Sequence, residues 1–339
     1  MKRFCSSFCL IFCILSLSAQ NDMLSFNMYN TGVSYLKNNN IDSALYCFSK
    51  SLAINPELSK AYYNSAYCYY ILRDYDNCLR NIDMFMKNNI TADCVYLRGR
   101  CNHHLGNLET ALADYYNATI IDGNMDMAYY YCGVINFEGG DYAKAISYFS
   151  KALNINGKKS VYYYNRGCCY KRMGEYELAI NDFIKALSLG DNSPRLKNNL
   201  AFCYMKTRNV RNAVKNVNEA LGTDSAFVET YNTNGLVSYL MRNMKQMVIQ
   251  LTDGLAHRPN DIVLLNNRGV AYFELGNYES ALADFDKVLR LNPDDAEAYF
   301  NRGNTKMMLR DVYGACSDWH QAQSRGIELQ EWIIEECEP

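Results

Sequence analysis

One pattern recurs along this chain with a period of 34 residues. The stretch GVAYFELGNYESALADFDKVLRLNP at 269–293 repeats the pattern of GVINFEGGDYAKAISYFSKALNING at 133–157 and of GCCYKRMGEYELAINDFIKALSLG at 167–190. A period of this length is typical of a chain built from copies of one small supersecondary unit, each of which packs only on its neighbours. The 339 residues therefore predict a repeat array rather than two ordinary domains.

The repeat frame contains nine units between residues 25 and 326, and each unit has a small residue at its eighth position. These residues are Gly32, Ala66, Gly99, Gly133, Gly167, Ala201, Gly235, Gly269 and Gly303. Because Gly destabilises a helix by about 1 kcal/mol relative to Ala, its return at this position needs a packing reason.

A second small residue lies twelve positions after the first in most units and suggests that reason. These residues are Ala44, Ala111, Ala145, Ala179, Ala213, Ala281 and Ala315. Between the two positions stand the turn dipeptides Gly140-Asp141, Gly174-Glu175 and Gly276-Asn277, which are typical of a left-handed helix end followed by a new helix. Each unit is thus predicted to be a helical hairpin whose two antiparallel helices touch backbone to backbone.

The order of these residues resembles the tetratricopeptide repeat, whose signature has a small residue, Tyr, Ala, Phe, Ala and Pro at these offsets. The resemblance covers about nine tenths of the chain, residues 25–326. It implies an all-α solenoid, a right-handed superhelix of about nine hairpins, with a concave groove lined mainly by the first helix of each hairpin.

The segment IELQEWIIEECEP at 327–339 follows the last unit and is expected to form a capping helix and tail. Ile327, Trp332 and either Ile333 or Ile334 fall on one side of such a helix, and the glutamates fall elsewhere. A stack leaves its last apolar face bare, and a helix with a polar back would cover it.

The first twenty residues have the layout of a secretory signal peptide. Lys2 and Arg3 precede an apolar run from Phe8 to Leu15 and then small residues, with cleavage expected near Gln20. The run is too short for a membrane-spanning helix, and no later run is long enough to anchor the mature chain. We therefore expect an exported protein, periplasmic or secreted; the alternative is a buried N-terminal helix.

The 14 cysteines do not form a disulfide framework. Three lie in the predicted signal peptide, and the other 11 lie inside predicted helices with no Cys-x-x-Cys pair at metal-binding spacing. Most are expected to be small core residues. One or two pairs remain able to oxidise in a secreted protein.

Composition and motifs argue against several classes of function. The net charge of −2 and the lack of basic runs give no basis for a nucleic-acid partner. Metalloprotease, nucleophile-elbow and phosphate-loop motifs are absent from the sequence, so no enzyme activity, metal or cofactor is expected. His103 and His104 are interpreted as surface residues beside the groove; a metal site at this pair is the alternative.

The fifth position of each unit carries the clearest indication of a binding site. The residues there are Tyr29, Tyr63, Tyr96, Tyr130, Tyr164, Asn198, Asn232, Asn266 and Phe300. A row of phenols offers rigid contact surface at low entropic cost, and the amides can pair with the backbone of an extended peptide. Packing between repeats is the alternative explanation for these residues.

Asparagine also recurs at the sixth position, as Asn30, Asn64, Asn165, Asn199, Asn267 and Asn301. These residues resemble the asparagine ladders by which some superhelices of the same family hold peptide backbones. No unit has Lys at its fifth position, so the family's clamp for C-terminal carboxylates is not expected. The predicted function is a non-catalytic scaffold for a protein or peptide; the alternative is a carbohydrate or cell-wall binder that stacks sugars on the tyrosine row.

Overall fold

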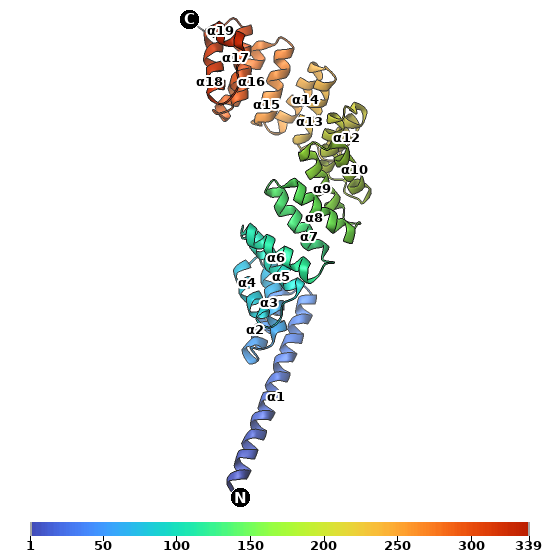
Figure 1. The fold of residues 1–339 in the computed structure, drawn as a ribbon, viewed down its shortest axis with the longest axis vertical. Coiled ribbons are helices and arrows are strands. Elements are labelled where there is room, and N and C mark those ends of the chain that lie inside the picture. The colour runs from blue at the N-terminus through green and yellow to red at the C-terminus, as the bar shows by residue number, and fades with distance from the viewer. Residues whose placement is uncertain (1, 338–339) are drawn as a thin grey trace. The chain divides into compact units, whose positions relative to one another are not determined.

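The computed structural model describes the backbone of residues 2–337 and the side chains of residues 20–333, 335 and 337. In this part of the chain all regular secondary structure is helical, which confirms the predicted all-α solenoid of hairpins (Figure 1). Its helices are α1 (Lys2–Lys37), α2 (Ile41–Ile54), α3 (Ser59–Ile71), α4 (Tyr75–Met86), α5 (Ala92–His104), α6 (Leu108–Ile121), α7 (Asp126–Glu138), α8 (Tyr142–Ile155), α9 (Ser160–Met173), α10 (Tyr176–Ser188), α11 (Pro194–Lys206), α12 (Val210–Thr223), α13 (Glu229–Leu240), α14 (Met244–His257), α15 (Ile262–Glu274), α16 (Tyr278–Leu291), α17 (Ala296–Met308), α18 (Val312–Ser324) and α19 (Glu331–Cys337). The odd-numbered helices up to α17 are the first helices of the hairpins, and the even-numbered ones are the second helices.

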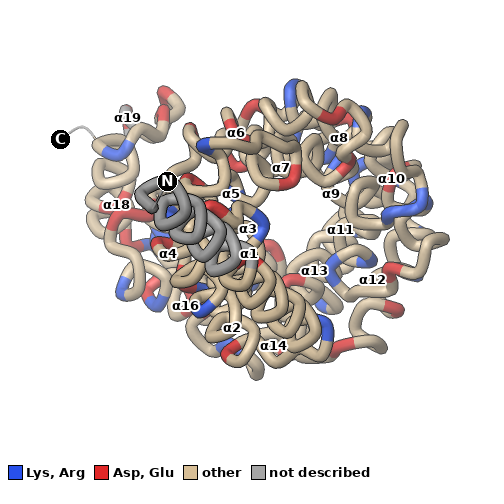
Figure 2. The backbone as a smooth tube through the Cα atoms, turned by 90° about the horizontal axis from the view of Figure 1, so that it is seen from below, with Lys and Arg blue, Asp and Glu red and all other residues tan. Residues whose placement is uncertain are grey.

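The chain divides into two compact units, residues 1–158 with α1–α8 and residues 159–339 with α9–α19. The repeat pattern runs through residue 158 without a break, so the sequence did not predict this division. In both units Lys and Arg positions are interspersed with Asp and Glu positions along the helices, as Figure 2 shows.

The turn inside each hairpin places one residue in the left-handed region. Gly140, Gly174 and Gly276 have φ angles of 80°, 82° and 77°, as the turn dipeptides predicted. At the corresponding turns Asn39, Arg73, Arg208, Arg242 and Arg310 adopt the same conformation with φ between 57° and 66°. In several hairpins the next residue is an Asp or Asn that caps the second helix; Asp141, for example, accepts a hydrogen bond from the Lys144 amide.

The small residue at the eighth position makes room for a large side chain of the second helix. A Cβ atom built on Gly133 would lie 2.6 Å from the Phe149 ring, and one on Gly269 would lie 2.7 Å from the Phe285 ring. The expectation that the two helices touch mainly backbone to backbone is thus incomplete, because the ring of the second helix fills the space above the glycine. The Ala residues twelve positions later are fully buried in the same contact, as at Ala145.

Within each unit, successive hairpins stack mainly through the second helix of one and the first helix of the next, but first helices also touch one another. These contacts join α1 to α3 and α3 to α5 in the first unit, and connect each first helix from α9 to α17 with the next in the second unit. In the described chain no two second helices share a comparable contact. Each stack therefore bends toward its first helices, and their exposed side is its inner face.

Four hairpins hold a buried ion pair that the sequence analysis did not anticipate. The guanidinium of Arg268 on α15 donates to both carboxylate oxygens of Asp284 on α16, at 2.8 and 2.7 Å. The other pairs have the same spacing of 16 residues and are Arg98–Asp114, Arg166–Asp182 and Arg302–Asp318. An Arg directly before the small eighth residue, followed by Asp 16 positions later, was the signal in the sequence.

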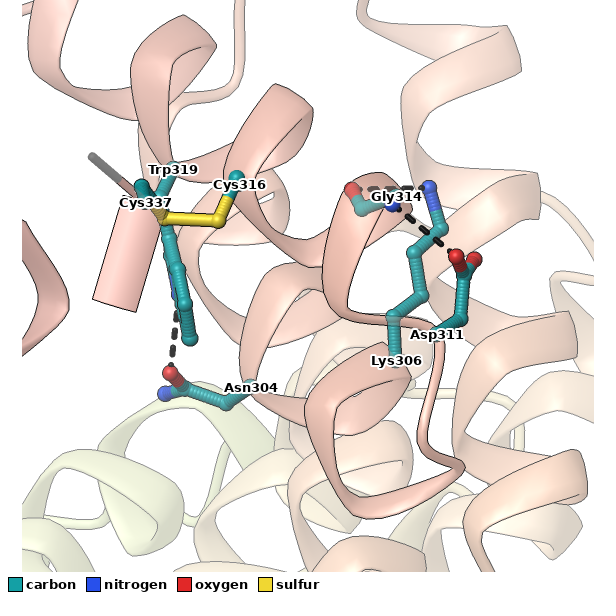
Figure 3. Close-up of a disulfide and its surroundings, with 7 residues drawn as sticks. All are labelled: Asn304, Lys306, Asp311, Gly314, Cys316, Trp319 and Cys337. Carbon is teal, nitrogen blue, oxygen red and sulfur yellow. Dashed lines mark hydrogen bonds between the residues drawn. A yellow bond between two sulfur atoms is a disulfide. The ribbon is translucent and has the colours of Figure 1, made fainter. Parts of the chain in front are cut away.

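The C-terminal segment caps the last hairpin as expected, but with a shorter helix and a covalent tether. α19 has seven residues, and its Ile333 packs against Ala315 and Trp319 of α18. Cys337 forms a disulfide with Cys316 of α18 (Figure 3). Trp332, which was expected on the packed side, is half exposed and meets the Trp319 ring edge to face. The cap is thus attached by a covalent bond as well as by apolar contact.

The predicted signal peptide, residues 1–20, lies almost wholly outside the residues whose side chains are described. The C-terminal half of α1 packs on α2, beginning with Asp22 and Ser25, which bond to Asn55 and Ser51. Within the described residues, we find no helix with the length and apolar character needed to cross a membrane.

Candidate binding face

The fifth-position side chains all lie half-buried on the first helices. Each tyrosine ring of this row packs against a ring of its own second helix, with centroid distances from 5.3 Å for Tyr63 and Phe85 to 5.9 Å for Tyr164 and Phe183. Burial raises the pKa of Tyr63 and of Tyr96 to about 12, so both phenols stay neutral at physiological pH. The row therefore contributes to packing as well as to the inner face.

The structure divides this row between the two compact units. Tyr29, Tyr63, Tyr96 and Tyr130 belong to the first unit, and Tyr164, Asn198, Asn232, Asn266 and Phe300 belong to the second. Phe300 packs against the core under the cap, formed by Ala315, Trp319 and Ile333. Within each unit the row follows neighbouring first helices.

Several sixth-position asparagines bond to the fifth-position residue of the preceding hairpin. The side-chain amide of Asn64 donates to the Tyr29 hydroxyl at 3.1 Å, and Asn199 donates to the Tyr164 hydroxyl at 3.1 Å. In the same way Asn267 donates to the side-chain oxygen of Asn232 at 2.6 Å. Asn165 instead donates to a backbone carbonyl of its own helix, that of Val161. These amide groups thus join one repeat to the next.

Two fifth-position residues carry an unpaired polar atom. The side-chain oxygens of Asn198 on α11 and Asn266 on α15 are buried and have no hydrogen-bond partner among the described residues. An unpaired buried acceptor destabilises a fold by about 1–3 kcal/mol. The same position in two hairpins therefore holds an acceptor whose hydrogen-bonding capacity the fold does not use.

A cluster of rings surrounds Arg100 on α5, and sequence reasoning missed it. The guanidinium carbon lies 5.0 Å from the ring centre of Tyr70 on α3, 5.8 Å from that of Tyr96 and 4.9 Å from that of Tyr131 on α7. Arg100 also donates hydrogen bonds to the hydroxyls of Tyr96, at 3.2 Å, and Tyr70. Residues 61 positions apart in the sequence thus meet around one cation on the inner face.

The two predicted surface histidines border this cluster. His104 stacks on Tyr75 with centroids 4.8 Å apart, and its Nε2 lies 3.1 Å from the Tyr70 hydroxyl. Burial and the nearby Arg100 charge lower the pKa of His104, so this ring is neutral at pH 7. His103 lies 3.8 Å from the half-exposed carboxylate of Glu138.

Lys171 on α9 is a second cation of the inner face, in the other unit. Its ammonium donates to the side-chain oxygen of Asn199 at 2.7 Å and lies 5.6 Å from the Phe202 ring centre. Burial lowers the pKa of this ammonium.

Among the side chains that the structure describes, no cluster of His, Cys, Asp and Glu is arranged to hold a metal ion.

The match to known families follows the hairpins. Models of the tetratricopeptide repeat match residues 128–159, 160–192 and 256–309. The chain contains tetratricopeptide repeats. A further model, for subunit 3 of the anaphase-promoting complex or cyclosome, matches residues 37–118. Together these matches reach hairpins in both compact units.

Solved tetratricopeptide-type structures resemble the fold at low identity. A tetratricopeptide repeat protein from Parabacteroides merdae is 21% identical, with a TM-score of 0.60 over 73% of this chain and 97% of its own. The anaphase-promoting complex hetero-tetramer Cut9–Hcn1 is 13% identical, with a TM-score of 0.58 over 91% and 75%. Pseudomonas aeruginosa pilF is 19% identical, with a TM-score of 0.54 over 62% and 97%. No curated protein matches the sequence. At these identities the likeness shows the fold alone.

Proposed function

We propose that the protein is a non-catalytic scaffold that binds a protein or an extended peptide on the inner face of its tetratricopeptide stack, in an exported compartment. Tetratricopeptide repeats generally serve as protein-interaction scaffolds. The observation that carries the proposal here is the pair of unpaired buried oxygens of Asn198 and Asn266. Both lie at the fifth position of a first helix, so an amide that turned toward the inner face on binding would offer a peptide N–H an acceptor that the fold leaves unused.

Sugar stacking on the tyrosine row is a weaker explanation. A sugar ring needs an open aromatic face, whereas Tyr29, Tyr130 and Tyr164 each contact a Phe ring of their own hairpin at 5.8–5.9 Å. The half-buried phenol edges that remain suit hydrogen bonds and edge contacts with a peptide better than stacking on a pyranose. We therefore retain the peptide scaffold as the proposal.

The binding test compares variants that should lose affinity without losing stability. The mature chain is used to capture partners from the native envelope, the captured protein is identified and purified, and its affinity is then measured by calorimetry. Asn266→Ala should weaken binding by about tenfold, the worth of one hydrogen bond to a ligand. Because the oxygen it removes is unpaired in the free protein, the melting temperature should not fall.

Lys215→Ala on the second helix α12 is the control, because this residue is exposed and makes only a 3.8 Å ion pair with Glu219. It should leave affinity unchanged. Loss of affinity in this control, with full affinity in Asn198→Ala and Asn266→Ala, would place the partner on the outer helices and refute the proposal.

Export is supported by the layout of the first twenty residues and by the Cys316–Cys337 disulfide, since such bonds persist in oxidising compartments. N-terminal sequencing of the native product should find a chain that begins near Gln20. A cytosolic product that still begins at Met1 would contradict the proposed location.

A further inference from the structure

Arg100 differs from the four arginines of the buried ion pairs in having no anionic partner. Arg98, two residues earlier, is bound by the buried carboxylate of Asp114. Among the described residues, Arg100 donates hydrogen bonds only to the hydroxyls of Tyr70 and Tyr96, and no carboxylate lies within ion-pair distance of it. Arg100 is half-buried, and taking part of a charge out of water without a counter-ion is unfavourable, so this cation calls for a functional explanation.

The surrounding groups do not neutralise this cation. Burial is the largest influence on both hydroxyl partners and raises the pKa of Tyr70 and of Tyr96, so neither is a phenolate at pH 7. His104 is neutral for the reason given above, and the Glu138 carboxylate is next to His103 instead. The three ring faces attract the guanidinium but carry no net charge. The positive charge of Arg100 therefore remains uncompensated in the free protein.

The guanidinium also keeps hydrogen-bonding capacity for a ligand. It has five N–H donors, of which the two bonds to hydroxyls use two. The planar fork of an arginine matches the two oxygens of a carboxylate, and bonds of this charged kind are about twice as strong as neutral ones. The rings of Tyr70 and Tyr131 hold the fork in place, so little side-chain entropy remains to be lost on binding.

We propose that Arg100, held between Tyr70, Tyr96 and Tyr131, is a subsite for a carboxylate of an acidic extended peptide. The subsite lies within the first compact unit, on the inner side of α3, α5 and α7. It rests on the proposed function and adds to it the chemistry of the ligand: the partner segment presents Asp or Glu side chains, or a free C-terminus, to this position.

The test uses three short fluorescein-labelled peptides that differ only in their carboxylates. One has two adjacent glutamates in its middle and an amidated end; the second replaces them with glutamines; the third has the glutamines and a free C-terminal carboxylate. Fluorescence anisotropy with the full mature chain should give at least about tenfold tighter binding for one of the carboxylate peptides than for the neutral peptide. Which of the two binds identifies the source of the carboxylate.

Variants then assign the preference to Arg100. Arg100→Gln should abolish the difference between acidic and neutral peptides, and Arg100→Lys should retain part of it because the charge remains. Lys151→Gln is the matched control: Lys151 is an exposed cation over the rings of Tyr129 and Tyr148, but on the second helix α8. It removes the same charge and should leave the preference unchanged. Thermal unfolding of each variant verifies that the fold is intact. If Arg100→Gln does not fold, the affinities of Arg100→Lys for the acidic and neutral peptides are compared with those of the wild type instead.

Two results would overturn the subsite: equal binding of all three peptides by the wild-type chain, or an acidic preference that survives in both Arg100 variants. The proposed scaffold function would stand separately if the captured natural partner still lost affinity in Asn266→Ala. The converse result is that Arg100 is necessary for the preference for acidic peptides while Asn198→Ala and Asn266→Ala leave the partner's affinity unchanged. That result would support the subsite and indicate that the peptide binds along the first unit.

Discussion

The pair between Arg268 and Asp284 allows a quantitative test of what holds a hairpin together. The side chains are 19% and 8% exposed, and two bonds of 2.7–2.8 Å join them. Arg268→Met keeps an apolar stem of similar length but leaves the carboxylate buried without its partner. Breaking such a pair destabilises a protein by about 3–5 kcal/mol. Because each hairpin contacts only its neighbours, the loss should appear in urea unfolding as an early transition of the second unit, measured by circular dichroism at the helix signal.

The same reasoning predicts recovery when both charges are removed. Arg268→Met with Asp284→Leu should regain most of the lost stability, since replacing a buried pair by apolar residues is often neutral. Arg258→Met is the control, because its ion pair with Glu229 has side chains 51% and 49% exposed, and such pairs contribute about 0–1 kcal/mol. Two results would refute the argument from burial. One is an equal loss of unfolding free energy in the Arg268 and Arg258 variants, and the other is a double variant that is less stable than Arg268→Met alone.

Three further changes test the cap, the hairpin crossing and the turns. Cys337→Ser removes a disulfide that spans 21 residues and should destabilise the last hairpin by about 3 kcal/mol. The unfolding of this hairpin is measured by the fluorescence of the two tryptophans, which both lie near the cap. An unchanged unfolding midpoint would mean that apolar contact alone holds α19. Gly269→Ala should lower stability by about 1–3 kcal/mol because its Cβ would meet a ring at 2.7 Å, whereas Gly222→Ala, with open space around it, should not lower the urea midpoint. Arg310→Gly, at φ 66°, should raise the melting temperature by relieving a left-handed conformation. Arg290→Gly, in the right-handed last turn of α16, should lower the free energy of unfolding by up to about 1 kcal/mol and with it the melting temperature. The same sign for both variants would contradict the turn geometry.

The parts of the fold that were predictable from sequence are those that repeat. Nine small residues at one position and glycines between paired helical segments determine a hairpin and its period, because each has the same local cause in every copy. The side chain that fills the space beside the small residue was harder to predict from the sequence. The ring of Phe149 above Gly133 depends on the direction of a side chain across the helix crossing, which spacing alone does not give.

Features without a period were missed for related reasons. The environment of Arg100 combines residues of three first helices, so no window of the sequence contains it. The Cys316–Cys337 bond depends on where a seven-residue helix docks, and an odd number of cysteines gave no pairing. The fifth-position row was recognisable as a row, yet its balance between packing and contact depends on half-burial, which requires coordinates.

The placement of the buried ion pairs has a consequence for how such a chain can change its length in evolution. In each of the four hairpins the arginine finds its buried carboxylate on the second helix of the same hairpin, 16 residues later. A duplicated or deleted copy of 34 residues therefore carries this arginine and its buried aspartate together, although Arg302 also bonds Asp286 of the preceding hairpin at 2.7 Å. Crossing-over between copies of the gene segment would change the number of hairpins and the reach of the inner face while keeping the buried pair within each remaining copy that has one.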